Sequence, residues 1–173
     1  MKYKEQRIDQ KLRDWFNNDN TRALLRRVEV EKGRIRGLSK IQIGFGYPIA
    51  GIAGVNGAGK STLLALVCCA FHNTSKGYRL PSRPRPYYTF RDFFIQHTSE
   101  IPPSGIEILY SIAYDKWAKT PTLPDGVGLG RQRRTKRRGG KWNDYYRRVK
   151  RNVAFIGVER VVPHYGDMTR SCG

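Results

Sequence analysis

The sequence predicts a single α/β domain, and three observations carry this prediction. An apolar run at residues 49–53 has the length of a buried strand, residues 63–71 have the length and composition of a buried helix, and a glycine-rich segment joins the two. Further upstream, residues 27–31 and 38–45 alternate between apolar and polar side chains, as half-buried strands do. We therefore expect a strand–loop–helix unit beside a small antiparallel sheet.

The segment that joins the predicted strand and helix, residues 54–62, is a complete phosphate-binding loop of the form GxxxxGK[ST]. Its glycines let backbone N–H groups surround a polyphosphate with no Cβ in the way, and the helix N-terminus adds its positive dipole end. Lys60 can reach the β- and γ-phosphates as ligand and catalytic residue, and the Ser61 hydroxyl can ligate Mg²⁺. The loop thus predicts ATP and Mg²⁺ as ligands, held by Gly54, Asn56, Gly57, Ala58, Gly59, Lys60, Ser61 and Thr62.

Periodicity places the remaining elements. Apolar residues at 8, 12 and 15–16 recur at helical spacing, so residues 1–20 are predicted to contain an amphipathic helix. That helix can dock on the rest of the chain or on a partner, and we expect the first. Residues 21–173 then form the phosphate-binding lobe, with further strands predicted at 105–114 and 152–158 and an exposed basic loop or hairpin at about 120–151.

Charge is the second strong signal in the chain. The net charge is +19, and residues 131–151 hold eleven Lys and Arg residues against one acid, Asp144. Cations interleaved with Trp142, Tyr145 and Tyr146 suit phosphate contacts combined with base stacking, so DNA is the first expectation. An acidic protein partner and an inert solvated surface stay open as alternatives. The candidate nucleic-acid contacts are Arg133, Arg134, Lys136, Arg137, Arg138, Lys141, Arg147 and Arg148.

Composition argues against several classes of protein. No apolar stretch approaches the ~20 residues that span a bilayer, and the charged N-terminus leads into no signal sequence, so we expect a cytoplasmic protein without a membrane partner. Three cysteines do not suggest a disulfide scaffold. The three histidines are scattered and lack zinc-ligand spacing.

The phosphate-binding loop, together with residues 45–53 before it, resembles the ABC-type ATPase heads of the SMC, RecF and OLD-like superfamily. Residues 88–95 and 152–164 look like the ATPase subunits of bacterial anti-phage systems such as PARIS. The resemblance implies the N-terminal lobe of a P-loop ATPase with an antiparallel strand subdomain beside the nucleotide. It also implies that a later Gln touches Mg²⁺ or the attacking water. Gln96 is the candidate for that role, and a plain surface Gln is the alternative.

Two parts of such heads are missing from the sequence. There is no LSGG-like signature, and the nearest approaches to a Walker B strand, residues 112–115 and 155–159, lack the Asp-Glu pair. Both are better explained as strands with a charged end. We therefore expect an incomplete lobe that hydrolyses ATP only when a C-terminal lobe or second subunit completes it.

The sequence thus leads to two hypotheses about function. The main one is a homo-oligomeric, nucleotide-gated switch in DNA maintenance or anti-phage defence, which signals to DNA or to an effector such as a nuclease. The alternative is a non-hydrolysing interaction module that binds nucleotide structurally. Such a module would hold a protein partner or nucleic acid through its basic segment.

Overall fold

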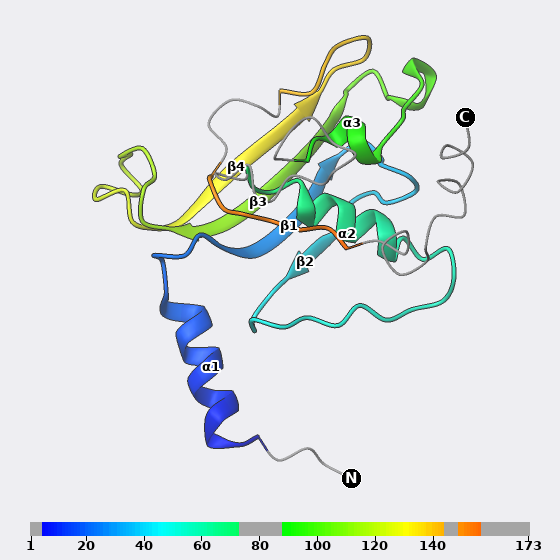
Figure 1. Ribbon diagram of the computed structural model, residues 1–173. Helices are drawn as coiled ribbons and strands as arrows, with labels where there is room; N and C mark the ends of the chain where they lie inside the picture. Colours follow the sequence, from blue (N-terminus) through cyan, green and yellow to red (C-terminus); the bar gives the residue numbers. More distant parts are fainter. Residues whose placement is uncertain (1–4, 73–87, 144–148, 157–173) are drawn as a thin grey trace, which may run out of the picture.

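The computed structural model describes residues 5–72, 88–143 and 149–156, and an antiparallel sheet is its centre (Figure 1). The strands follow the spatial order β2-β1-β3-β4, and every neighbouring pair is antiparallel. Their bounds are β1 Leu24–Lys32, β2 Gln42–Gly44, β3 Ile106–Tyr114 and β4 Gly128–Lys136. The helices are α1 Arg7–Asn18, α2 Lys60–Cys68, the short α3 Phe90–Phe93 and the 3₁₀ turn η2 Thr98–Glu100.

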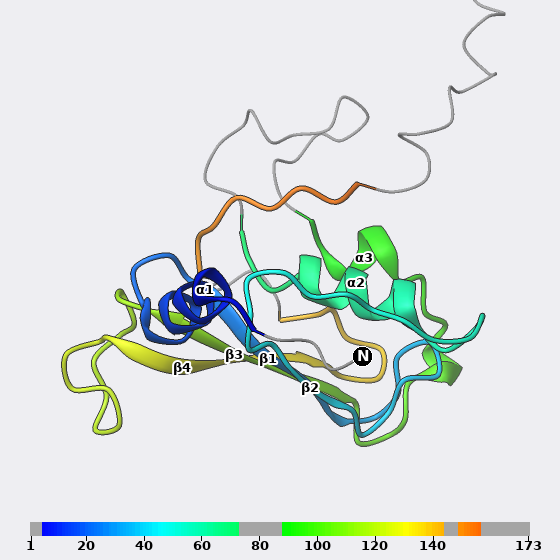
Figure 2. The same cartoon turned by 90° about the horizontal axis from the view of Figure 1, so that it is seen from below.

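The helices α2 and α3 lie on the same face of the sheet, which Figure 2 shows nearly edge-on. Burial of apolar residues explains this arrangement, because Leu63 and Leu66 of α2 and Ile108 and Ile112 of β3 belong to one core cluster. Polar bonds then fix α2 at a defined position. The Tyr110 hydroxyl donates to the Leu66 carbonyl at 2.8 Å. The C-terminal half of the phosphate-binding helix is therefore held against the sheet.

The central strands β1 and β3 confirm the predicted strands at 27–31 and 105–114. All residues of β3 except Tyr114 are buried, and the strand pairs with β1 on one side and β4 on the other. The predicted strand at 38–45 is shorter in the structure, because only β2, Gln42–Gly44, forms a ladder. Residues 33–39 instead form a tight turn in which Ile35 and Leu38 exchange two backbone hydrogen bonds of 2.9 Å.

The predicted strand at 49–53 is wrong for this chain: these residues are irregular and run from β2 to the start of α2 (Figure 1). In the described part of the chain, no strand lies beside this segment to receive its backbone hydrogen bonds. Ile49 and Val55 are 78% and 79% exposed as a result. The apolar run has strand composition but no partner strand, and pairing, not composition, makes a strand.

The second error concerns the basic segment, where an exposed loop or hairpin was expected and β4 is found. Its residues alternate between exposed and buried from Leu129 to Arg134, so it follows the period of a strand despite its charge. Residues 152–156, by contrast, are irregular instead of a strand, and residues 157 and 158 lie outside the described part.

The helix α1 confirms the predicted N-terminal helix but not its expected docking on the rest of the chain. Only Phe16 is buried, at 6% exposure, in a small cluster with Leu24 and Ala113. Ile8, at 56% exposure, and Leu12 face solvent. The helix is therefore anchored in the core through its last turn and projects away from the sheet (Figure 1). In its first turn, Asp9 Oδ1 accepts from the Tyr47 hydroxyl at 3.5 Å. Among the described helices, none has the length and apolar character that crossing a bilayer requires.

Candidate nucleotide-binding site

The glycines of the phosphate-binding loop adopt the backbone conformation that makes their identity necessary. Gly57 and Gly59 have φ of +82° and +89°, a left-handed region that strains residues with a Cβ. Gly59 is the residue that precedes α2, and it offers no side chain to cap the helix. The N–H groups of the first turn thus keep their capacity to bind an anion, and the helix dipole favours negative charge there.

Gly59 also lies against the 33–39 turn. A Cβ built on Gly59 would fall 2.5 Å from Leu38 Cδ2, so the Leu38 side chain would have to shift to make room for it. Gly57, in contrast, has no heavy atom within 4 Å of such a Cβ, so its restriction is conformational alone. The Leu38 contact was not predicted from the sequence. Gly33 and Gly37, which flank the turn, were the available signal that a tight turn lies here.

Lys60 reaches back over its own loop. Its Nζ donates to the Gly54 and Val55 carbonyls, each at 2.7 Å. In the described part of the chain the ammonium contacts no carboxylate. The charge is therefore positioned at the mouth of the loop without being neutralised by an acid, which suits a group that receives phosphate oxygens.

The two hydroxyl residues after Lys60 have different surroundings. Ser61 is exposed on the first turn of α2, where its hydroxyl is accessible to a metal ion, whereas Thr62 is buried against the sheet. Asn56 and Ala58 lie in the loop itself, and the Ala58 N–H donates to the Val55 carbonyl at 3.2 Å. A hydroxyl of this kind supplies one of the oxygen ligands that Mg²⁺ prefers, while water and phosphate supply the rest.

Gln96 lies across the 33–39 turn from the loop. It lines a hollow of about 770 Å³ together with residues of that turn, among them Arg34 and Arg36. Its Oε1 is buried and has no hydrogen-bond partner among the described residues. A buried amide oxygen is stabilised by a hydrogen-bond donor, so a water or ligand in this hollow can donate to it. Arg34 and Arg36 were not singled out from the sequence.

Neither candidate Walker B segment has a carboxylate at the loop in the described structure. Asp115 follows the C-terminal end of β3, whereas the 33–39 turn beside the loop contacts Gly105 and Ile106 at the other end. Nine strand residues separate these ends by about 30 Å. Of the second candidate, Phe155 and Ile156 are irregular and Glu159 lies outside the described residues.

The basic residues predicted as nucleic-acid contacts have different surroundings in the described structure. Arg133 forms an ion pair with Glu107, and Arg134 is buried with its Nη1 bonded to the Arg133 carbonyl. The Lys136 ammonium donates to the Gly140 carbonyl. Three others are exposed in the turn that follows β4, namely Arg137, Arg138 and Lys141. The last two, Arg147 and Arg148, lie outside the described residues.

Comparison with known proteins identifies the family. No curated protein and no solved structure matches the chain. The family model AAA_23, described as an AAA domain, matches residues 33–154, which is more than half of the sequence. The match begins at the turn that contacts Gly59 and includes the whole phosphate-binding loop, Gln96 and the strands β3 and β4. The chain therefore belongs to the AAA domain family of P-loop, nucleotide-binding ATPases.

Proposed function

We propose that this chain is the phosphate-binding lobe of a nucleotide-gated switch, which binds ATP with Mg²⁺ and hydrolyses it only when a second lobe or subunit completes the site. The observation that carries the proposal is the loop at 54–62: two glycines with positive φ lead into an uncapped helix N-terminus next to Lys60. Backbone N–H groups and the Lys60 ammonium bind phosphate oxygens, and Ser61 holds Mg²⁺.

The groups near the loop determine which steps this chain performs and which steps need a second lobe or subunit. Bound Mg²⁺ supplies charge that neutralises the phosphates, and Gln96, across the 33–39 turn from the loop, is our candidate to contact Mg²⁺ or the attacking water. Hydrolysis also requires a group that positions and activates water. Since Asp115 lies at the far end of β3, we assign that group to the completing lobe or subunit.

Exposed apolar side chains at the loop also support completion of the site by another polypeptide. The exposed apolar residues Ile49 and Val55 border the loop and have no strand beside them in the described structure. A partner strand paired with residues 49–53 would bury this surface and lie directly beside the phosphates. The partner is a C-terminal ATPase lobe or a second copy of the chain. The cellular role that fits is signalling to DNA or to an effector nuclease, in DNA maintenance or anti-phage defence.

The alternative is a non-hydrolysing module whose nucleotide is structural. The placement of Asp115 favours it, because a lobe without a water-activating acid can bind ATP and keep it. Under this alternative, nucleotide binding stabilises the chain, and the basic surface holds the partner. The two functions share the loop and differ only in turnover.

Binding of a fluorescent ATP analogue with Mg²⁺ tests the central claim. The Lys60→Ala variant should bind at least about tenfold more weakly, because it loses the charge-assisted contacts to phosphate. The matched control is Lys11→Ala, which removes an exposed lysine of α1 and should leave affinity unchanged. Equal affinity of the Lys60→Ala variant and the wild-type chain would refute the proposal.

A further inference from the structure

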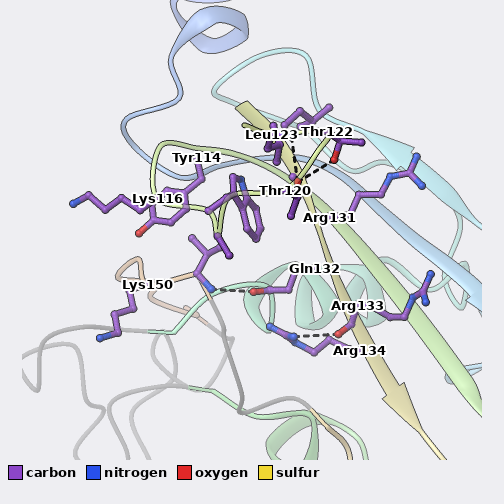
Figure 3. A pocket seen from close by; sticks show the side chains of 15 residues that line it. Tyr114, Lys116, Thr120, Thr122, Leu123, Arg131, Gln132, Arg133, Arg134 and Lys150 are labelled. Atoms are coloured by element: carbon purple, nitrogen blue, oxygen red, sulfur yellow. Dashed lines mark hydrogen bonds between the residues drawn. The ribbon is translucent and has the colours of Figure 1, made fainter. Parts of the chain in front are cut away.

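A large hollow in the described structure lies along the outer edge of β4, away from the phosphate-binding loop. Its volume is about 1360 Å³, above the ~300–1,000 Å³ of most small-molecule sites. The connection between β3 and β4, the strand β4 and residues 149–150 form its walls (Figure 3). None of the fifteen residues that line it is acidic, and five of them are Lys or Arg. The hollow is therefore suited to an anionic ligand larger than one nucleotide.

Three of these cations are available to a ligand. Lys116, Arg131 and Lys150 are exposed, and none forms an ion pair with an acid in the described part of the chain. Figure 3 shows Lys116 and Lys150 on one side of β4 and Arg131 on the other. The three cations therefore flank the edge strand, and a nucleic-acid backbone that crosses the edge of β4 can contact cations on both sides.

An aromatic platform completes the hollow. The Trp117 indole lies flat over Gly130, where a Cβ would fall 2.3 to 2.7 Å from three ring atoms. Its Nε1 donates to the Gly128 carbonyl at 3.2 Å, and Tyr114 contacts it edge-on with ring centroids 5.9 Å apart. The ring is thus held in place while it lines the hollow. A fixed indole among cations is the arrangement on which unpaired bases stack.

We propose that this hollow binds single-stranded nucleic acid, with a base stacked on Trp117 and phosphates held by Lys116, Arg131 and Lys150. A single strand is favoured over a duplex because only unpaired bases present their faces to a ring inside a hollow. It is favoured over an acidic peptide because a peptide of carboxylates uses the cations but leaves the indole without a stacking partner. The site is independent of the phosphate-binding loop.

Fluorescence anisotropy of a dye-labelled oligothymidylate of about 15 nucleotides tests the cations. Arg131→Gln and Lys150→Gln should each weaken binding about threefold to tenfold and reduce its salt dependence. The control Arg137→Gln removes the same charge from the exposed turn outside the hollow and should change affinity less than twofold. Equal losses in the Arg131→Gln and Arg137→Gln variants, or equally tight binding of a duplex or of polyglutamate, would overturn the proposal.

The aromatic platform has a test that changes no charge. Gly130→Ala should displace the indole and weaken oligothymidylate binding, whereas Gly44→Ala in β2, where the nearest atom is 3.9 Å from the new Cβ, should not. If Gly130→Ala fails to fold, the Trp117→Phe and Trp117→Leu variants are compared instead. A Phe ring can still stack on a base, so Trp117→Phe should bind oligothymidylate more tightly than Trp117→Leu. Identical oligothymidylate affinity of these two variants would refute the stacking of a base on Trp117. Lys60→Ala should leave oligothymidylate binding unchanged, so failure at either site is distinguishable from failure at the other.

Discussion

Glu107 links three strands across the sheet face opposite α2. It accepts from Arg133 Nε of β4 at 2.6 Å and from Lys32 Nζ of β1 at 3.3 Å. Burial alone would raise the pKa of Glu107, but hydrogen bonding with Glu31 and Lys32 and the positive charges of Arg133 and Lys32 outweigh it, so the pKa lies below its ordinary value. The carboxylate is thus favoured in the folded state, and it stabilises a sheet that is otherwise crowded with positive charge.

Glu107→Gln should lower the free energy of unfolding by about 1 kcal/mol at pH 7, a modest value because both cations are mostly exposed to water. A carboxyl with a lowered folded pKa contributes stability above its unfolded pKa of about 4.3 and loses it as pH falls through the folded pKa. The difference between wild type and variant in urea unfolding should therefore shrink as the pH falls below about 4.3.

Asp125→Asn is the control for that experiment, since it removes an acid from an exposed loop at the same change in net charge. If it destabilises the chain as much as Glu107→Gln does, general repulsion within a +19 protein, not the two ion pairs, is the cause.

At the scale of single residues, the sequence was sufficient to predict the phosphate-binding loop but not the contacts around it. Lys60 and Gly59 were predictable because phosphate binding demands those residue types at a fixed spacing. The Leu38 contact, the ion pairs of Glu107 and the burial of Arg134 depend on which strands become neighbours. No local pattern in one sequence encodes that pairing.

At the scale of elements, α1 shows how an amphipathic helix can form with little support from the sheet. Phe16 anchors it among Leu24 and Ala113, and the Arg26 guanidinium lies 4.2 Å from the Phe16 ring centroid. The exposed Ile8 and Leu12 belong to the same apolar face but contact no core cluster. Helical spacing therefore predicted the helix correctly and its docking only at the last turn.

Phe16→Ala should lower the free energy of unfolding by about 2–3 kcal/mol, because it empties a buried aromatic site and removes the contact with Arg26. Ile8→Ala, on the exposed part of the same face, should change it by less than about 0.5 kcal/mol. Urea unfolding of both variants measures the difference. A large loss in Ile8→Ala would show that the apolar face is covered in solution.

The strands also differ in how well the sequence predicted them. β3 was predictable because its apolar residues are continuous and bounded by turns, as central strands are. β4 was missed because six of its nine residues are Gly or basic, so its period of two was hidden by its charge. Residues 49–53 were assigned wrongly for the opposite reason: they have strand composition without a neighbour.

At the scale of the whole molecule, the described structure supports phosphate binding but brings no carboxylate of the candidate Walker B segments to the loop. The sheet, α2 and the loop form a rigid support for phosphate, whereas Asp115 is about 30 Å from the loop end of β3. Charge is distributed over both the loop and the β4 hollow, so the chain favours anions at two separate places.

Single-turnover measurements with radiolabelled ATP should show that this chain alone hydrolyses bound ATP no faster than the Lys60→Ala variant. The physical reason is that phosphate binding without an activated water leaves the barrier to phosphoryl transfer almost unchanged. Hydrolysis by the isolated chain well above that of the variant would contradict the division of the site between two polypeptides.

The irregular segment before the phosphate-binding loop has a consequence for the entropy of assembly. It is anchored at one end by β2 and at the other by α2, and it is drawn out between them (Figure 1). Ordering a free segment costs about 1–2 kcal/mol per residue in backbone entropy. Because both ends of this segment are already fixed, part of its backbone entropy is lost before a partner strand pairs with it. The chain on its own is thus prepared for the pairing that would complete its nucleotide site.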